Sequence, residues 1–486
     1  MGSIGTVVNC AWGAEVCRSR VGKSSLGTDA ANRSYSVRLL CERQRFTAKN
    51  SGTDHRSQQI IAGFNARSIK LSFPSVARNL LFIFPGDQNL FRRNLVAAVL
   101  CLCSLAWSQT APKPVILIKA GHLFDARSGR ILINQAILIE GDRIKEVGDA
   151  ATLAAHAVGA RTIDLSSATV LPGLIDAHNH VLGNPKDLSP ISDLRMSSAQ
   201  AALWGARNLR IWLDHGFTLV RDACEPDPYY AQIALRDSVA RGLIPGPRMV
   251  AAGSCISVTG GHGDADQLAV DQALPRRPNL ADTVDEVAQV TRRDIKYGAD
   301  WIKLMATGGV MDTLSDFRVQ ELSEAQMAKA VEVAHRANKN VMAHAHGTAG
   351  IKAAVRAGVD SIEHGSLLDD EGAQLMVQKG TWLVPTIDVE LRTLEMGASF
   401  GVEPVMMEKE RQVVKLKRAG FEVALKHSVR IAFGVDDDPD YLDREFEAMV
   451  AWGMKPADAL QAATVNAAEL LGLSDQVGSL EPGKFA

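Results

Sequence analysis

Residues 169–180 read Thr-Val-Leu-Pro-Gly-Leu-Ile-Asp-Ala-His-Asn-His, an apolar run that ends in His178 and His180. The Leu171-Pro172-Gly173 turn followed by apolar residues is typical of a short buried strand. Side chains at positions i and i+2 of a strand point to the same side, so the two histidines can bind one metal ion. An H-x-H pair by itself also describes an ordinary surface pair. Its place at the end of an apolar strand favours a metal site.

Seven further apolar runs follow along the chain, separated by longer stretches with helical periodicity. This alternation of short strands and helices predicts βα units around a parallel sheet. Most runs end in a residue that can bind metal or substrate. The eight runs are TVLPGLIDAHNH (169–180), GFTLVRDA (216–223), GPRMVAAGSCIS (246–257), ADWIKLMATGG (299–309), KNVMAHAHG (339–347), VDSIEHGS (359–366), TWLVPTID (381–388) and VRIAFGVDDD (429–438).

Eight such units predict a (β/α)₈ barrel, in which the carboxyl ends of all strands form one active-site face. Side chains far apart in the sequence would then meet at one mouth. The helices between the strands also fit this fold. In SEAQMAKAVEVAHRAN, Ser323 is a suitable N-cap, and Met327, Ala330, Val331 and Ala334 form an apolar stripe.

The segment before the barrel, residues 109–170, has a different pattern. Apolar and polar residues alternate over 114–148 and are interrupted by Ser-Gly and Gly-Asp turns, which predicts hairpin-linked strands. We expect a small flanking β-sandwich domain, built from 109–170 and from a returning segment at 471–486, beside a barrel at 171–470. The sequence stops just after a GSLEPGK turn, so we expect this returning segment to be truncated.

The N-terminal part contains a signal-peptide pattern. Two arginines, Arg92 and Arg93, precede an apolar run over 95–106, and the small residues Ala106 and Ser108 resemble a cleavage site. The run is shorter than the ~20 residues that span a bilayer, which favours a cleaved signal at 92–108 over a permanent anchor. We therefore expect a secreted or periplasmic protein. Residues 1–91 are then either an over-extended gene start or a genuine disordered extension.

Composition excludes several classes of protein. Hydrophobic residues make up 46% of the chain, enough for a large core, and the formal net charge is −2 without a long basic run. Neither property favours a nucleic-acid partner. Of the seven cysteines, only Cys224 and Cys255 lie after residue 110, and they form no C-x-x-C pair. Cysteine is therefore a poor candidate for a metal ligand or a redox centre.

Five of these motifs, LPGLIDAHNH, WIKLMATGG, VMAHAHG, SIEHGS and AFGVD, occur in the order found in the amidohydrolase superfamily. The chain most resembles the branch that contains imidazolonepropionase-like proteins and bacterial Xaa-Pro dipeptidases (prolidases). ALRDSVARGLIPGPRMVAAG and SVTGGHGD add matches to the dipeptidase-like part of that branch. The resemblance covers roughly residues 114–486 and is specific, because several motifs match in order.

The resemblance implies a binuclear metal site. His178, His180 and Asp436 would hold one divalent ion, and His344 and His364 the second. Lys303 would bridge the two ions after its amine has reacted with CO₂, because an ammonium has no lone pair to offer a metal. A lysine desolvated at a barrel mouth has a lowered pKa, which makes the neutral amine available. Zinc is the metal expected for such nitrogen and oxygen ligands, with manganese and iron as alternatives.

Two positions leave a choice. In AHAH, His344 and His346 share a strand face, so spacing alone does not choose between them. The family pattern implies His344 as the ligand, with His346 contacting substrate or supporting the site. Family members often carry Thr-Asp-Ser at this strand end, where this chain has the run Val435-Asp436-Asp437-Asp438. Asp436 directly follows the apolar strand and is the favoured ligand and catalytic proton carrier.

The residues that contact the substrate are less clearly indicated by the sequence. The glycine-rich stretch 260–264 follows the third strand and could carry His262 to the substrate, although an incidental turn histidine is the alternative. Tyr229 or Tyr230 resembles a tyrosine that binds the substrate carboxylate in the dipeptidase branch. Arg318 is a further candidate carboxylate anchor, with an exposed surface arginine as the alternative.

We therefore expect a metal-dependent amidohydrolase that cleaves an amide C–N bond with a metal-bridging hydroxide, acting as an Xaa-Pro dipeptidase. One alternative is hydrolysis of another N-acyl or cyclic amide, as in imidazolonepropionase, although Lys303 and the signal pattern argue against it. A mononuclear deaminase fits less well, and a catalytically inactive binding barrel is the non-enzyme alternative. The expected partner is a small molecule or dipeptide, with homo-oligomers possible and no membrane contact after signal cleavage.

Overall fold

The computed structural model describes residues 6–7, 113–272 and 274–486. The predicted signal peptide at 92–108 therefore lies outside the described residues, as does nearly all of the predicted extension at 1–91. The described residues from Val115 to Ala486 belong to one compact unit. Among the described helices, none is long and apolar enough to cross a membrane.

The first part of this unit is a five-stranded mixed sheet with the order β1-β5-β2-β3-β4. The alternation of apolar and polar residues along β2 and β3 places one set of side chains, including Ile118, Leu123 and Ile137, in a small core. A short helix, α2, follows β4 and is capped by Asp149. The strands are β1 (Thr6–Val7), β2 (Val115–Asp125), β3 (Arg130–Glu140), β4 (Arg143–Asp149) and β5 (Arg161–Val170), and α2 is Ala150–His156.

The C-terminal residues return to this sheet, as the sequence predicted. The Ile144 amide donates to the Lys484 carbonyl at 2.9 Å, and the Ala486 amide donates to the Asp142 carbonyl at 3.0 Å. The guanidinium of Arg143 stacks 3.5 Å from the centre of the Phe485 ring. The segments before and after the barrel thus share one small β domain.

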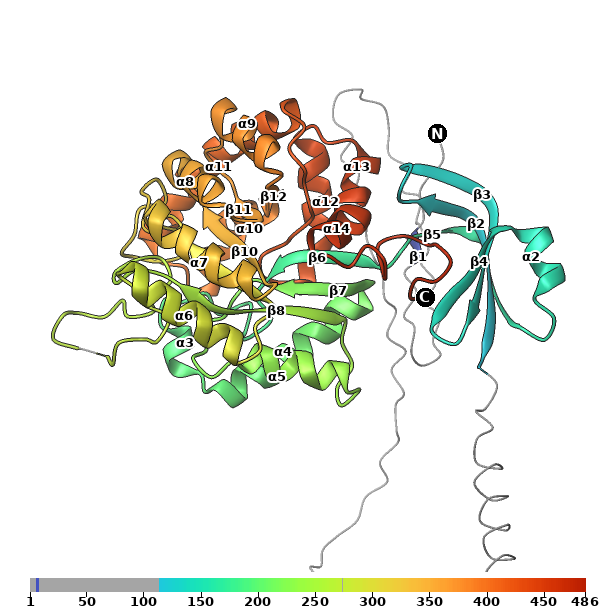
Figure 1. The fold of residues 1–486 in the computed structure, drawn as a ribbon, viewed down its shortest axis with the longest axis horizontal. Helices are drawn as coiled ribbons and strands as arrows, with labels where there is room; N and C mark the ends of the chain where they lie inside the picture. The colour runs from blue at the N-terminus through green and yellow to red at the C-terminus, as the bar shows by residue number, and fades with distance from the viewer. Residues whose placement is uncertain (1–5, 8–112, 273) are drawn as a thin grey trace, which may run out of the picture. The chain divides into compact units, whose positions relative to one another are not determined.

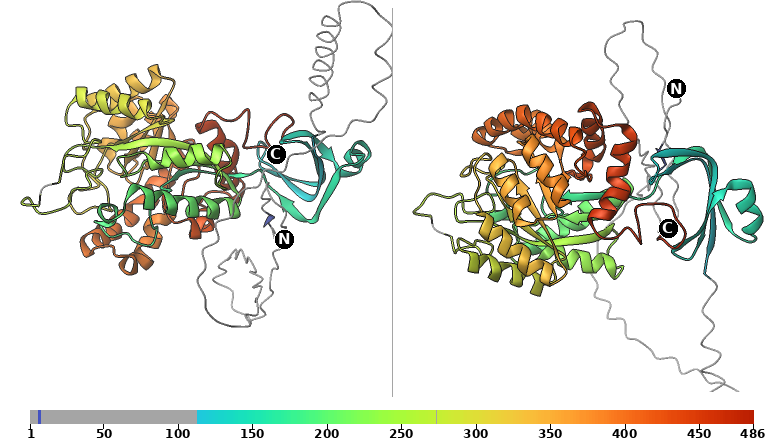
Figure 2. Two further views of the ribbon diagram at one scale, coloured as in Figure 1. Left: turned by 90° about the horizontal axis from the view of Figure 1, so that it is seen from below. Right: turned by 45° about the horizontal axis from the view of Figure 1, so that its top comes forward.

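The second part is a parallel sheet of seven strands, hydrogen-bonded in sequence order from β6 to β12. Figures 1 and 2 show the helices arranged around the outside of these strands. The first seven apolar runs each contain a strand that is buried along most of its length, which explains the near-absence of alternating polar residues. The strands are β6 (Leu174–Asn179), β7 (Phe217–Asp222), β8 (Arg248–Ile256), β9 (Trp301–Met305), β10 (Asn340–Ala345), β11 (Ser361–His364) and β12 (Trp382–Val384).

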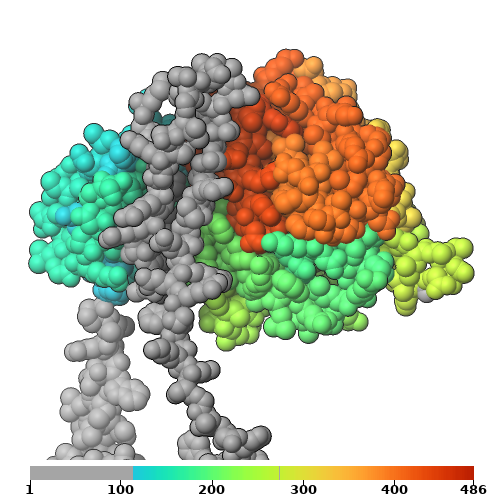
Figure 3. Space-filling model, turned by 180° about the vertical axis from the view of Figure 1, so that it is seen from behind, coloured from blue at the N-terminus to red at the C-terminus, as the bar shows by residue number. Residues whose placement is uncertain are grey.

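The eighth predicted strand, VRIAFGVDDD, closes the barrel as an irregular segment between β12 and β6. On one side the Leu383 amide donates to the Arg430 carbonyl at 2.8 Å. On the other side the Ala177 amide donates to the Phe433 carbonyl at 2.8 Å, and bridges link 383 to 431 and 179 to 436. Figure 3 shows the surface of the first barrel segments adjoining that of the last. The (β/α)₈ prediction is therefore confirmed.

The helices pack their apolar faces on the strands. Helix α7 behaves as predicted, because Ser323 forms a capping box with Gln326, and Met327, Ala330, Val331 and Ala334 are buried. The helices are α3 (Ser192–Arg195), α4 (Ser198–Asp214), α5 (Ala231–Ala240), α6 (Val284–Lys296), α7 (Glu324–Arg336), α8 (Thr348–Ala357), α9 (Asp370–Lys379), α10 (Ile387–Met396), α11 (Pro404–Lys426), α12 (Leu442–Ala451), α13 (Pro456–Gln461) and α14 (Ala467–Leu470). Short helical turns are η2 (Gly397–Phe400), η3 (Pro439–Tyr441) and the π-helical η4 (Ala462–Asn466).

Candidate metal centre

The carboxyl ends of four strands and the closing segment bring the predicted ligands together. His178 lies on β6, Lys303 on β9, His344 on β10 and His364 at the end of β11. The ring centres of His178 and His364 are 5.1 Å apart, and those of His344 and His364 are 4.6 Å apart. These four side chains are buried in the barrel and are shielded from solvent water.

Asp436 joins the histidines into one cluster. Its Oδ1 atom lies 3.1 Å from Nε2 of His178 and 3.3 Å from Nε2 of His180, and its Oδ2 atom lies 3.8 Å from Nδ1 of His364. Burial acts to raise the pKa of this carboxyl, but the contacts with His178, His180 and His364 outweigh it and hold the pKa well below its usual range. Asp436 is therefore an ionised carboxylate at neutral pH.

The structure brings only the first of the three consecutive aspartates to the cluster. Asp436 has a φ of +86°, a conformation that costs free energy for any residue except glycine, and its amide donates to the His178 carbonyl at 2.7 Å. Asp437 instead pairs with the guanidinium of Arg392. Asp438 caps the η3 turn by accepting a hydrogen bond from the Asp440 amide at 3.0 Å.

Two groups of potential ligand atoms lie in this cluster. One comprises His344, His346 and His364, and the other comprises His178, His364 and Asp436; within each group the atoms are within 4.8 Å of one another. His346 therefore lies as close to the cluster as His344, and the geometry leaves both histidines as possible ligands.

The buried histidines carry the lone pairs that a metal needs. Burial, together with neighbouring histidines and lysines, lowers the pKa of His344, His346 and His364 well below the usual value, so their rings are neutral. The Nδ1 atoms of His346 and His364 lie 2.7 Å from Ser366 Oγ and 2.8 Å from Thr386 Oγ1.

His178 is oriented by a buried ion pair that the sequence did not reveal. Its Nδ1 atom lies 2.5 Å from Oε2 of Glu363, and Arg221 Nη2 donates to Oε1 of the same carboxylate at 3.0 Å. Both charged side chains are fully buried. Nε2 of His178 is left as a buried nitrogen without a hydrogen-bond partner among the described residues. An orphaned buried nitrogen, in a cluster of neutral histidines and a carboxylate, fits a divalent metal ion.

Lys303 is 1% exposed and faces the same cluster. Burial lowers the pKa of its ammonium to about 8, although the nearby Glu363 and Asp436 carboxylates raise it. Within the described residues, no hydrogen bond or ion pair involves this side chain. The amine is thus buried, uncommitted and only weakly basic, as the predicted reaction with CO₂ requires.

His262 reaches the cluster from the glycine-rich loop, where the sequence placed it. Its ring centre is 4.4 Å from that of His344. Its Nδ1 atom lies 2.7 Å from Asp312 Oδ2, and its amide donates to Glu321. The ammonium of Lys409 donates to the Asp312 carbonyl oxygen at 2.8 Å and anchors the acidic partner. Asp312 and Lys409 were not predicted, because they lie 50 and 147 positions after His262.

The other predicted substrate residues lie in different surroundings. The Tyr230 hydroxyl donates to Asp294 at 2.7 Å and accepts from Arg293 at 2.9 Å, so it is already satisfied by helix α6. Tyr229 is 78% exposed. Arg318 bonds to Asp316 and Gln412, while its neighbour Phe317 packs edge-on to His346 at 6.2 Å. None of these three is placed among the histidines, and their substrate roles stay predictions.

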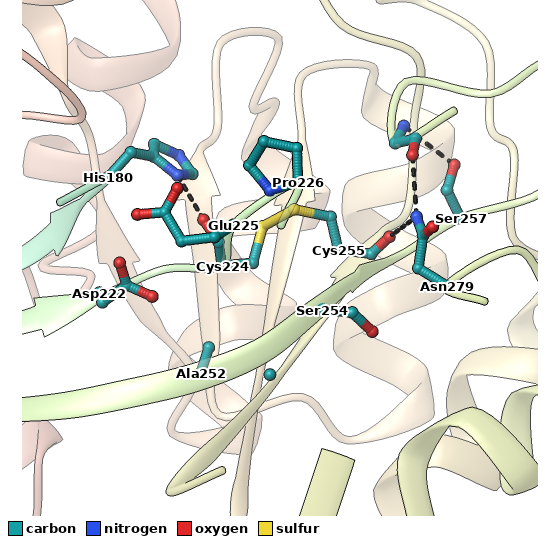
Figure 4. The surroundings of a disulfide bond; sticks show 12 residues. His180, Asp222, Cys224, Glu225, Pro226, Ala252, Ser254, Cys255, Ser257 and Asn279 are labelled. Carbon is teal, nitrogen blue, oxygen red and sulfur yellow. Dashed lines mark hydrogen bonds between the residues drawn. A yellow bond between two sulfur atoms is a disulfide. The ribbon is translucent and has the colours of Figure 1, made fainter. Parts of the chain in front are cut away.

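The two cysteines of the barrel form a disulfide that the sequence analysis did not predict. Cys224 follows β7, Cys255 ends β8, and their Cα atoms are 5.4 Å apart. Nδ1 of His180 lies 2.6 Å from the Cys224 carbonyl oxygen, as Figure 4 shows. The separation of 31 residues contains no local signal, because only the parallel pairing of β7 with β8 brings the cysteines together.

The comparisons agree with this geometry. A model of the amidohydrolase family matches residues 169–486. Ochratoxinase from Aspergillus niger is 32% identical over 404 residues, which cover 79% of this chain and 80% of that protein. A crystal structure of an Xaa-Pro dipeptidase with methionine bound in its active site has 32% identity and a TM-score of 0.72, covering 76% of this chain and 92% of that one. A prolidase complexed with N-methylphosphonate-L-proline has 32% identity and a TM-score of 0.70, covering 76% of this chain and 91% of that one. The chain belongs to the amidohydrolase family of hydrolases, which act on carbon–nitrogen bonds, and carries a histidine cluster suited to metal binding.

Proposed function

We propose that this protein hydrolyses amide bonds with two divalent metal ions, zinc being the expected metal. His178, His180 and Asp436 would hold one ion, and His344 and His364 the other. The observation that carries the proposal is the Asp436 carboxylate, which lies 3.1 Å from His178 and 3.3 Å from His180 at the mouth of the barrel. Facing it is the uncommitted amine of Lys303.

Lys303 would join the two metal positions as a carbamate. Its neutral amine attacks the carbon of CO₂, an N–C bond forms, and one proton is released to solvent. The product carries a negative charge and two oxygen ligands in place of an ammonium, which would repel metal ions. A buried lysine whose pKa is about 8 supplies the neutral amine at a useful concentration near neutral pH.

Bound divalent ions would acidify a water molecule and polarise the amide carbonyl of the substrate. The protein supplies the proton transfer. The Asp436 carboxylate can accept the proton that the attacking water loses and then deliver it to the departing amine nitrogen. Glu363 keeps the proton of His178 on Nδ1, and Asp312 holds His262 close to His344, where it can donate a hydrogen bond to the substrate.

The proposed substrate is a dipeptide of the Xaa-Pro type. Support comes from the solved Xaa-Pro dipeptidase and from the prolidase with its proline phosphonate, both 32% identical to this chain. Another N-acyl amino acid or a cyclic amide is the second candidate. The weaker matches to imidazolonepropionase, at 24% and 26% identity, favour the cyclic amide.

We further propose that the protein is secreted or periplasmic. The Cys224–Cys255 disulfide supports this location, because disulfides persist in oxidising compartments and are rare in the cytosol. The signal-peptide pattern at 92–108 points the same way.

The direct test is hydrolysis of a panel of substrates by the zinc-loaded protein. The panel contains Xaa-Pro dipeptides, dipeptides without proline, N-acyl amino acids and cyclic amides. We expect the Xaa-Pro dipeptides to give the highest kcat/KM, and Asp436→Asn to lower kcat by at least 10²-fold, the low end of the range for proton transfer. Asp458→Asn, an exposed aspartate, is the matched control. A metal-loaded protein that cleaves no amide in the panel would refute the proposal.

A further inference from the structure

We propose that the Cys224–Cys255 disulfide positions His180 for metal binding. The inference rests on the proposed metal-dependent function and adds a part to that site. A disulfide in a barrel of this size is not needed to supplement a small core, since the described residues already bury a large one. The disulfide instead lies beside the predicted ligands, where it can fix the position of a single side chain.

The first link is the hydrogen bond between His180 and the disulfide residue itself. A carbonyl oxygen can only accept, so Nδ1 of His180 must carry the proton that it donates to Cys224 over 2.6 Å. In the neutral ring that a metal ion would bind, the lone pair is then on Nε2, which lies 3.3 Å from Oδ1 of Asp436. The Cys224 carbonyl therefore fixes both the tautomer and the orientation of the ring.

The second link connects this carbonyl to the strand beside Lys303. Cys255 is the register partner of Lys303 in the pairing of β8 with β9. The disulfide thus ties the loop after β7, which orients His180, to a rigid strand next to the proposed bridging lysine. Figure 4 shows the bond that joins Cys224 to Cys255, with the His180 ring above the Cys224 backbone.

His180 has more need of such support than the other histidines. Its side chain is 33% exposed, whereas that of His178 is fully buried and fixed by Glu363. The loop is also held by apolar packing of Ala223 and Cys224 and by backbone hydrogen bonds. The Ala223 amide donates to the Asn179 carbonyl at 2.8 Å, and the Leu182 amide donates to Glu225 at 2.8 Å. Cys224 is the one residue in this stretch whose position is fixed covalently.

The test compares the wild-type protein with the double variant Cys224→Ser/Cys255→Ser. Both proteins are loaded with zinc, and the release of metal to a chromogenic chelator is followed. We expect the variant to release one ion of the pair about 10- to 100-fold faster, as for other groups that orient a ligand. Ser254→Ala is the matched control, because Ser254 precedes Cys255 on β8 but its hydroxyl contacts Asp294. The control should release zinc at the wild-type rate.

A second measurement separates positioning of His180 from general stabilisation. In a His180→Ala background, removal of the disulfide should no longer accelerate zinc release, since the residue through which it acts is absent. If the disulfide were purely structural, its removal would accelerate zinc release to the same extent in both backgrounds, and that result would overturn the inference. If the double variant does not fold, Cys255→Ala alone breaks the bond and leaves Cys224 unchanged.

A third measurement needs no bound metal. Against burial, the contact with Asp436 raises the pKa of His180, so the imidazole ¹⁵N spectra of the metal-free protein are recorded at a pH where this ring is neutral. The wild-type protein should then show the His180 proton on Nδ1, and the double variant should show a mixture of the two tautomers. An unchanged tautomer would contradict the inference even if the proposed function holds. A wild-type protein that binds no zinc would refute the proposed function instead. Peptide mapping without reductant should recover Cys224 and Cys255 in one linked fragment, and free thiols there would also overturn the inference.

Discussion

Oε2 of Glu363 lies 2.5 Å from Nδ1 of His178, in the interior of the barrel where neither side chain is exposed. Burial alone would raise the pKa of this carboxyl, but the Arg221 guanidinium and His178 reverse the effect and lower the pKa to about 2. Glu363 is therefore ionised, accepts the Nδ1 proton of His178 and leaves the Nε2 lone pair directed at the cluster. The orientation of the His178 ring is thus set by buried residues of the barrel interior.

Replacing Glu363 should damage both stability and metal binding. In Glu363→Gln the Arg221 charge stays buried without a counter-ion, which we expect to cost about 3–5 kcal/mol in the free energy of unfolding. We also expect zinc affinity to fall about 10- to 100-fold. Chemical denaturation and competition with a chelator measure the two effects. Glu324→Gln, whose ion pair with Arg356 is exposed, should change the free energy of unfolding by less than about 1 kcal/mol.

The choice between His344 and His346 is open to a direct experiment. We expect His344→Asn to lose one of the two metal ions, and His346→Asn to keep both while kcat/KM decreases. Elemental analysis of the two purified variants, beside the wild-type protein, gives the metal content. Loss of an ion from His346→Asn together with full retention in His344→Asn would assign the ligand role to His346 instead.

We expect the contact between Asp312 and His262 to affect substrate turnover but not metal binding. Asp312→Asn removes the charge that holds the His262 ring, and a misplacement of about 1 Å can cost 10²-fold in rate. We therefore expect kcat/KM to decrease by about 10- to 100-fold at unchanged zinc content. Asp316→Asn, in which an exposed aspartate four residues further on is changed, provides the control. An Asp312→Asn protein that loses zinc would show that this loop supports the metal site itself.

The buried carboxyl of Glu445 should make the free energy of unfolding depend on pH. Burial raises the pKa of its carboxyl from 4.5 to about 8, against the backbone hydrogen bonds that lower it. Between these two values the folded protein binds more protons than the unfolded chain, so the free energy of unfolding falls as the pH rises through this window. In Glu445→Gln, whose amide oxygen can still accept from the Asp388 amide, the decrease between pH 6 and pH 8.5 should be smaller.

The measurement is denaturant unfolding of the metal-free protein at both pH values, so that metal binding does not contribute. Glu422→Gln, on the exposed side of α11, should leave the pH dependence of the wild-type protein unchanged. An equal decrease in Glu445→Gln and wild type would show that Glu445 is not the titrating group.

The fold and the grouping of the candidate ligand residues could be predicted because both depend on short local patterns. The apolar runs mark where the chain enters the barrel wall, and the carboxyl ends of parallel strands meet at one face, so the sequence predicts that His178, Lys303, His344, His364 and Asp436 lie together. The eighth run was recognised by its apolar residues, although its pairing with β12 and β6 is irregular. Asp436 could be favoured among three aspartates because it directly follows that run.

The supporting contacts could not be predicted, because they join residues with no local signal. Arg221 and Glu363 are 142 positions apart, and charged residues inside a barrel contradict the usual pattern of burial. The Cys224–Cys255 disulfide could not be predicted either, because only the pairing of β7 with β8 brings the two cysteines together. Tyr230 resembled a substrate residue by its place after β7, yet its φ of +59° and its hydrogen bond to Asp294 direct it to α6.

The central claim, a site that holds two metal ions bridged by Lys303, is tested most directly by elemental analysis. The purified wild-type protein should contain two divalent ions per chain. Lys303→Ala should lose metal and activity together, while Lys379→Ala, an exposed lysine, should keep both. A wild-type protein that hydrolyses amides without bound metal, or a Lys303→Ala protein that keeps two ions and full activity, would contradict the account.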